Sequence, residues 1–234
     1  MENIRNIILR NRFYLFAFLL FFFVGLTFLL YTSKAASFLY LNGYHNTALN
    51  AFFILYTNLG DGVFTILLVL FLLGTKRHEM AWQLLAAFLI SGLIAQVFKN
   101  CIYSPRPKLF FAEREHIYLI RGVTRTGTSS FPSGHTASIF ALVTILSLFA
   151  KNKKLCPVYL LPAILVAYSR IYLSQHFLTD VLAGSLLGVL VALFVYYFFH
   201  VQTMLRKRKA MESETEIYID TSSFEPVGLQ VEPR

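Results

Sequence analysis

Long apolar segments alternate with short polar ones along most of the chain. A transmembrane helix needs about 20 consecutive, mainly apolar residues, and six stretches approach or exceed this length. They cover about residues 13–31, 48–73, 80–98, 134–150, 157–173 and 179–199. The pattern predicts an all-α protein built as a bundle of six transmembrane helices, with little that would form a separate soluble domain.

The polar ends of the chain set the domain boundaries. We expect residues 1–12 to be a short N-terminal segment, residues 13–200 the membrane domain, and residues 201–234 a tail that is basic and then acidic. The tail beyond Met211 has no helical period of apolar residues, which predicts disorder. The first apolar segment could instead be a signal peptide, but it is longer than the usual apolar region of about 7–15 residues. That length favours a retained span.

Composition agrees with a membrane protein. Hydrophobic residues make up 56% of the chain and charged residues 14%, far from the average of soluble domains. The net charge of +9 is spread over several short loops, so a nucleic-acid partner is not expected. Cys101 and Cys156 fall at opposite ends of the predicted spans, too far apart for a disulfide.

Basic residues also predict the orientation. With six spans both termini lie on one membrane side, and that side carries most of the Lys and Arg residues near span ends. These are Arg5, Arg10, Arg12, Lys76, Arg77, Lys151, Lys153, Lys154, Arg206, Lys207, Arg208 and Lys209. Cytoplasmic loops are enriched in such residues. We therefore expect a multi-pass protein of a bacterial inner (plasma) membrane with cytoplasmic termini.

A first cluster of candidate functional residues follows the third span. Lys99 ends this span, and Arg106 stands between Pro105 and Pro107. Two prolines keep this segment extended, and a guanidinium held in this way suits bidentate contact with a phosphate. Lys99 alone could simply extend to the membrane interface. The long loop that follows, to Phe131, predicts either a packed cap or a segment that dips into the lipid headgroups.

A second cluster, Pro132-Ser133-Gly134-His135, opens the fourth span. Ser133 is typical of a helix N-cap. The free backbone N–H groups and the dipole of a helix start favour an anion, and Gly134 lets an oxygen approach the backbone closely. His135 would then lie beside that anion, where it could act as a general acid. A plain helix cap is the simpler interpretation of this motif taken alone.

The third cluster joins the fifth and sixth spans. Arg170 is an ionisable residue near the end of an apolar helix, a position that usually marks a functional site. His176 and Asp180 are four residues apart, so the carboxylate can hold one ring nitrogen and direct the other outward. Such a histidine can attack phosphorus. The pair could also be part of a metal site, but no third ligand has suitable spacing. These residues alone leave open which histidine attacks.

Together the three clusters resemble the signature of the type 2 phosphatidic acid phosphatase superfamily, membrane lipid phosphatases related to vanadium haloperoxidases. The motifs K-x6-R-P, P-S-G-H and S-R-x5-H-x3-D all occur in order, between Lys99 and Asp180. The resemblance implies a six-helix core with an outward-facing active site. It implies that His176 forms a phosphohistidine, Asp180 orients it and His135 protonates the leaving lipid oxygen. The implied phosphate ligands are Lys99, Arg106, Ser133, Gly134 and Arg170, with no metal or cofactor.

Several functional alternatives remain at this stage. The implied substrates are phosphatidic acid, phosphatidylglycerol phosphate, undecaprenyl diphosphate or lipid A phosphates. A phosphotransferase would use the same site with an acceptor other than water, and a haloperoxidase-like oxidation would need bound vanadate. A transporter would require polar residues along a path through the membrane, whereas here they concentrate at one face. The oligomeric state is not predicted.

Two further features lie within spans. Asp61 interrupts the second span, and a carboxylate at that depth is usually partnered within the bundle. It could neutralise a cation of the site, but structural support is the favoured interpretation. Gly184 and Gly188 form a G-x-x-x-G pair in the sixth span. Close helix packing within the monomer is favoured over a dimer interface.

Overall fold

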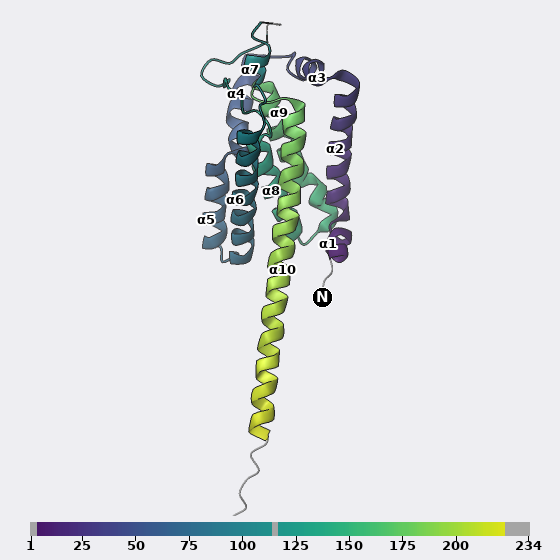
Figure 1. Cartoon of the computed structure of the whole chain (residues 1–234), viewed down its shortest axis with the longest axis vertical. Coiled ribbons are helices and arrows are strands. Elements are labelled where there is room, and N and C mark those ends of the chain that lie inside the picture. Colours follow the sequence, from purple (N-terminus) through teal and green to yellow (C-terminus); the bar gives the residue numbers. More distant parts are fainter. Residues whose placement is uncertain (1–3, 114–116, 223–234) are drawn as a thin grey trace, which may run out of the picture. The chain divides into compact units, whose positions relative to one another are not determined.

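The computed structural model describes residues 4–113 and 117–222. Within these ranges the regular elements are helices, apart from one isolated parallel bridge between Ser104 and Ser129 (Figure 1). The helices are α1 (Ile4–Arg10), α2 (Arg12–Thr32), α3 (Lys34–Leu41), α4 (Thr47–Tyr56), the 3-10 turn η1 (Thr57–Gly60), α5 (Gly62–Gly74), α6 (His78–Cys101), α7 (Pro107–Phe110), α8 (Gly134–Phe149), the 3-10 turn η2 (Lys153–Tyr159), α9 (Leu160–Tyr172) and α10 (Leu178–Ser222). The predicted all-α class is confirmed.

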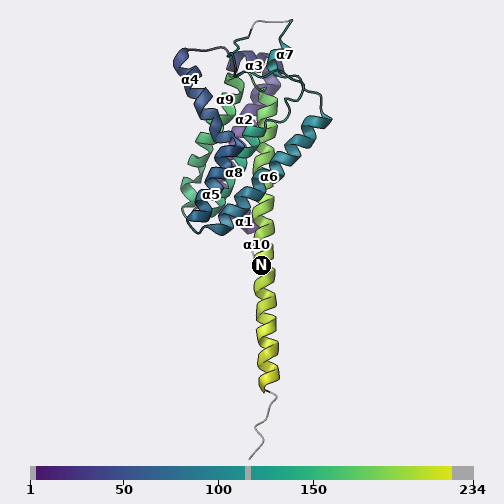
Figure 2. The same ribbon diagram turned by 90° about the vertical axis from the view of Figure 1, so that its left-hand side faces the viewer.

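Each predicted span coincides with helix. Four helical segments are long and apolar enough to cross a membrane: Arg12–Thr32, His78–Cys101, Lys153–Tyr172 and Leu178–Arg206. The second predicted span is a broken helix, in which Thr47–Gly60 and Gly62–Gly74 meet at 54° (Figure 2). Counted as one span, this pair makes a fifth. The protein is therefore a multi-pass membrane protein.

Helix α8 is the fourth predicted span, and its length explains why it is not among the helices long enough to cross a membrane. It has 16 residues, which corresponds to about 24 Å at 1.5 Å per residue, less than the hydrocarbon thickness of about 30 Å. Twelve of its residues are buried. A helix surrounded by protein need not match the lipid thickness, because its ends are covered by other residues rather than by lipid.

Helices α8 and α10 approach each other at backbone distance. A Cβ atom added at Gly184 would lie 2.5 Å from the Ser133 carbonyl oxygen, and one at Gly188 would lie 2.4 Å from that of Ala137. Neither distance is possible for a side chain, so the two glycines are required for this packing. The interpretation of the G-x-x-x-G pair as a packing motif within the monomer is confirmed.

The long loop after α6 is a packed cap. Phe111 is buried; its ring stacks on that of Phe38 at a centroid distance of 5.4 Å and is tilted against that of Phe177 at 6.1 Å. Tyr118 stacks on His45 at 4.1 Å. The loop thus covers the ends of the helices that carry the candidate site. The two cysteines are both free, as predicted.

The C-terminal helix is longer than the sequence predicts. One compact unit ends at Tyr197, and α10 continues to Ser222 rather than ending near residue 199. Residues 201–222 lack an apolar period but are rich in Lys, Arg, Met, Glu and Ala, which are strong helix formers. Residues 223–234 of the predicted disordered tail lie outside the described residues.

We predict that Gly188→Ala destabilises the protein, because the new methyl group overlaps backbone atoms of α8. Overpacking of this kind costs about 1–3 kcal/mol, and the midpoint of thermal unfolding in detergent should fall by several degrees. Gly92→Ala in α6 is the matched control, since no atom lies within 4 Å of its added Cβ. A Gly188→Ala midpoint equal to that of Gly92→Ala would contradict the packing role.

Candidate active site

The three predicted clusters come together where α8 and α10 begin. The backbone N–H of Ser133 donates to the carbonyl oxygen of Asp180 at 3.0 Å, which joins the two helix starts. The N–H of His176 donates to the carbonyl oxygen of Arg170 at 3.2 Å, so the end of α9 is tied to the turn before α10. These backbone contacts fix the positions of the functional side chains.

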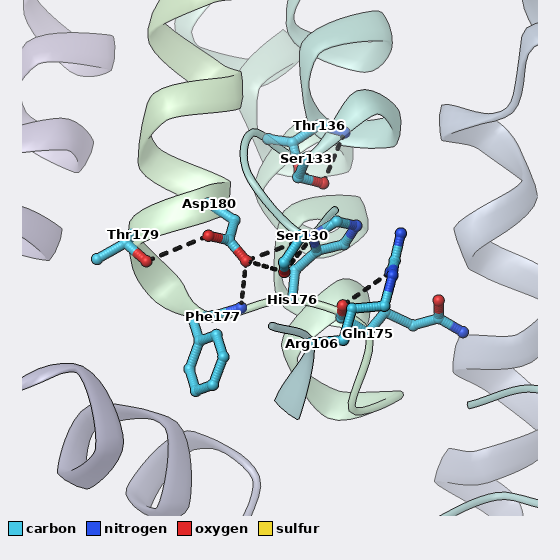
Figure 3. Close-up of polar contacts among 9 residues, drawn as sticks. All are labelled: Arg106, Ser130, Ser133, Thr136, Gln175, His176, Phe177, Thr179 and Asp180. Carbon is cyan, nitrogen blue, oxygen red and sulfur yellow. Dashed lines mark hydrogen bonds and ion pairs between the residues drawn. The ribbon is translucent and has the colours of Figure 1, made fainter. Parts of the chain in front are cut away.

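His176 and Asp180 form the predicted pair, and a third residue joins them (Figure 3). The Nδ1 atom of His176 lies 3.4 Å from the Asp180 Oδ2 atom and 3.3 Å from the Ser130 hydroxyl oxygen. Ser130 also donates to Asp180 Oδ2. Because Nδ1 faces these two groups, the other ring nitrogen, Nε2, is left for chemistry.

The carboxylate of Asp180 is fully buried but well satisfied. Its Oδ2 accepts the Phe177 backbone N–H at 2.9 Å, and Oδ1 accepts the Thr179 hydroxyl at 3.3 Å. Hydrogen bonds of this kind stabilise the charged form of a carboxylate. Asp180 therefore has a fixed orientation as well as a fixed position beside His176.

His176 is held in its neutral form. Burial lowers the pKa of His176 to about 4, and it outweighs the opposite effects of the hydrogen bond and the charge of Asp180. A histidine whose pKa is lowered gains its proton only as the pH falls toward that value. At neutral pH the ring is unprotonated, which is the form that has a free electron pair on Nε2.

Arg106 is held beside this pair by the loop. Its Nη1 atom donates to the carbonyl oxygen of Gln175 at 3.0 Å, next to His176 in the chain. Its backbone N–H donates to Gly127 at 2.9 Å. Burial and then the charge of Arg125, an exposed residue, lower the pKa of Arg106. Arg125 thus adds positive charge to the site, although no predicted motif includes it.

Arg170 is almost completely buried and keeps unused donor capacity. Its Nη1 atom donates to the Thr57 hydroxyl at 2.6 Å, while its Nε–H has no partner among the described residues. A buried guanidinium with an unpaired donor is costly unless an anion completes its contacts. Arg170 is therefore suited to hold a phosphate oxygen.

The start of α8 has the predicted capping geometry. The Ser133 hydroxyl accepts the Thr136 hydroxyl at 2.9 Å and the Thr136 N–H at 3.4 Å. In the part of the chain that the structure covers, the N–H groups of Gly134 and His135 have no acceptor. Lys99 Nζ lies 3.4 Å from where a Cβ atom of Gly134 would be. The ammonium group of Lys99 thus lies close to the free backbone N–H groups at the start of α8, an arrangement that favours an anion.

His135 faces a carboxylate of the second span. Its Nε2 atom lies 3.6 Å from Asp61 Oδ2, an ion-pair distance rather than a hydrogen bond. Asp61 Oδ1 accepts the Val63 N–H at 2.9 Å and so caps α5. Asp61 therefore supports the start of α5 and also reaches the candidate site through its contact with His135.

The structure brings all eight predicted site residues to this region and adds others that sequence reasoning missed. The additions are Ser130, Gln175, Thr57 and Arg125. Ser130 precedes the second motif by two residues, and Gln175 directly precedes His176, so proximity to a motif was an available signal. Thr57 stands out in the sequence as a polar residue within the second span, but its partner could not be predicted, because the contact joins residues 113 positions apart.

Comparison with known proteins agrees with these motifs. The family model of the PAP2 superfamily matches residues 80–204. The chain belongs to this superfamily. The resemblance inferred from the three motifs is confirmed.

Individual relatives are lipid phosphatases. The chain is 32% identical over 165 residues to the lipid A 4'-phosphatase of Porphyromonas gingivalis, covering 68% of this chain and 70% of that protein. It is 37% identical over 148 residues to lipid phosphate phosphatase 1 of Arabidopsis thaliana, covering 53% of this chain but only 45% of that protein. The crystal structure of Aquifex aeolicus LpxE matches with a TM-score of 0.61 at 29% identity, covering 68% of this chain and 92% of that one.

We predict that Ser130→Ala lowers activity by roughly 10- to 100-fold. The substitution removes a hydrogen bond to a buried carboxylate, and such bonds contribute about 1.5–3 kcal/mol. The measurement is kcat for phosphate release by purified protein. Ser129→Ala is the control, because no side-chain contact of Ser129 is seen among the described residues. Equal kcat values for Ser130→Ala and Ser129→Ala would contradict the role of this hydroxyl.

Proposed function

We propose that this protein is a metal-independent lipid phosphatase or diphosphatase that works through a phosphohistidine. The substrate would be a phosphomonoester or diphosphate on a lipid, of the phosphatidic acid, phosphatidylglycerol phosphate, undecaprenyl diphosphate or lipid A type. The observation that carries the proposal is the ring of His176, which is neutral and held in a fixed orientation. It lies beside cationic side chains, and the Nε–H group of one of them, Arg170, has no partner among the described residues. This is what in-line transfer of a phosphoryl group to nitrogen requires.

In the proposed mechanism the residues take the roles that the family resemblance implies. His176 Nε2 attacks phosphorus while His135 gives a proton to the leaving lipid oxygen. Water then hydrolyses the P–N bond and regenerates His176. The phosphate oxygens are held by the side chains of Lys99, Arg106, Arg170 and Ser133 and by the Gly134 N–H. Fixed cations and helix N–H groups supply the positive charge that a metal ion supplies elsewhere.

We further propose six spans, with the short α8 as the fourth, and an active site on the side away from the cytoplasm. The excess of basic residues near the ends of the helices on the opposite side supports this orientation. The site lies at the ends of α6 and α9 and the starts of α8 and α10, which all fall on one side of such a bundle.

This orientation is tested by cysteine labelling in a variant that lacks Cys101 and Cys156. We expect Arg121→Cys, in the exposed loop after α7, to react with an impermeant thiol reagent on intact cells. Lys151→Cys, in the exposed turn after α8, is the matched control and should react only after lysis. The reverse pattern would overturn the proposed side of catalysis.

The reaction itself is tested by phosphate release from a panel of those four lipid classes in the presence of EDTA. We expect purified protein to release phosphate from at least one lipid and to keep that activity after chelation. The described residues contain no group of three or more His, Cys, Asp or Glu side chains that could hold a metal. An absolute need for added magnesium would contradict the mechanism. A phosphorylated acceptor in place of free phosphate would identify a phosphotransferase.

Substitution of the two histidines should affect activity differently. His176→Ala removes the nucleophile and should leave only background activity on every substrate. His135→Ala removes the general acid, which typically raises the reaction rate by about 10²- to 10⁴-fold. The loss should be largest for substrates with a poor leaving group. The variant should therefore retain far more activity on p-nitrophenyl phosphate than on a lipid monophosphate. Substantial turnover of lipid by His176→Ala would require the two assignments to be exchanged.

A further inference from the structure

The second span breaks at η1, where its sequence is Gly60-Asp61-Gly62. α4 ends at Tyr56, the chain makes one 3-10 turn, and α5 begins at Gly62 after Asp61. No proline interrupts residues 47–74, although proline is the common cause of a sharp helix kink. A bend of 54° within an apolar span costs helical hydrogen bonds. The gain that offsets this cost must come from what the turn contacts.

The turn directs two polar side chains at two residues of the active site. The Thr57 hydroxyl accepts Arg170 at 2.6 Å, and Asp61 lies 3.6 Å from His135. Gly60 makes this approach possible. A Cβ atom there would lie 2.9 Å from the His135 carbonyl oxygen and 2.7 Å from a methyl carbon of Val166. The turn therefore lies directly against the first turn of α8.

We propose that Asp61 is the positioning residue of His135, so that the site contains a second histidine–carboxylate pair beside that of His176 and Asp180. This inference rests on the proposed phosphatase reaction and assigns the partner of its general acid. Asp61 faces Nε2 of His135. The other ring nitrogen, Nδ1, has no hydrogen-bond partner in the described chain and is the atom that gives up the proton.

The charges around His135 indicate what Asp61 contributes to it. Burial of the ring, and then the positive charges of Arg170, Arg125 and Lys99, disfavour a protonated His135, as does His176 when it is protonated. Like charges disfavour a protonated imidazole, and a nearby carboxylate favours it. Asp180 is engaged by His176, Ser130 and Phe177. Asp61, on the remaining side, is the carboxylate that faces His135, so it favours the protonated ring that a general acid needs.

The proton transfers balance over the two steps. As His176 Nε2 forms its bond to phosphorus, the bond from phosphorus to the lipid oxygen breaks, and that oxygen takes the proton from His135. In the second step water attacks phosphorus, the P–N bond breaks, and the proton of water returns to His135. Asp61 keeps its negative charge throughout and acts only through the ring.

The test separates the charge of Asp61 from its role as helix cap. Asp61→Asn keeps an effective N-cap but removes the charge, whereas Asp61→Ala removes both. Asn58→Ala, an exposed side chain of the same turn, is the matched control. Each variant is assayed on phenyl phosphate, a poor leaving group, and on p-nitrophenyl phosphate, a good one, as well as on the lipid panel. We expect Asp61→Asn to lose at least about tenfold on phenyl phosphate, part of the total acid contribution, and far less on p-nitrophenyl phosphate.

The same substitution in a His135→Ala background should have no further effect, because the residue through which Asp61 acts is gone. Equal losses of Asp61→Asn on both aryl phosphates, an undiminished loss in the His135→Ala background, or a loss seen only with Asp61→Ala would each overturn the inference. The aryl phosphates make these outcomes independent of the lipid. Turnover of aryl phosphates without release from any lipid would instead contradict the proposed function and leave the pairing measurable.

Discussion

The backbone contact between α8 and α10 is the interaction on which the site depends. Two glycines let the helices approach until only main-chain atoms separate them, and the hydrogen bond from Ser133 to Asp180 joins their first turns. His135 belongs to one of these helices, and His176 precedes the other. If the helices stood a few ångströms further apart, the two histidines could not take the positions proposed for them on opposite sides of one phosphorus atom.

This arrangement also concentrates positive charge. Two helix N-termini meet at the site, and four cationic side chains, Lys99, Arg106, Arg125 and Arg170, act on the same small volume. Such a collection is unfavourable without counter-charge. Asp180 and Asp61 provide part of it from within the chain, and a phosphate would provide the rest. The positive charge that is costly without a counter-ion is the same charge that would make a phosphorylated substrate bind.

The sequence was sufficient to predict the helices and the motif residues, because apolar length and motif spacing are both local features of the chain. Apolar length predicted all six helical regions, and fixed spacing predicted the pairing of His176 with Asp180. Contacts between distant segments were not predictable in this way. Ser130 and Gln175 reach the site through irregular backbone, where no periodicity relates residue number to direction, and Thr57 reaches it from the short 3-10 turn η1. Asp61 was visible as an isolated carboxylate, but its partner, 74 positions away, was not. The end of α10 was not predicted, because residues of high helix propensity can extend a helix without an apolar pattern.

The contrast in burial between α2 and α8 has an evolutionary consequence. Only 11% of the apolar window of α2 is buried, so most of its side chains need only be hydrophobic, and many sequences meet that requirement. In α8 twelve of 16 residues are enclosed by other helices, and each substitution there changes a specific fit. Mutations should therefore accumulate far faster in α2. The match to the family model agrees with this expectation, since residues 80–204 include α8 and exclude α2.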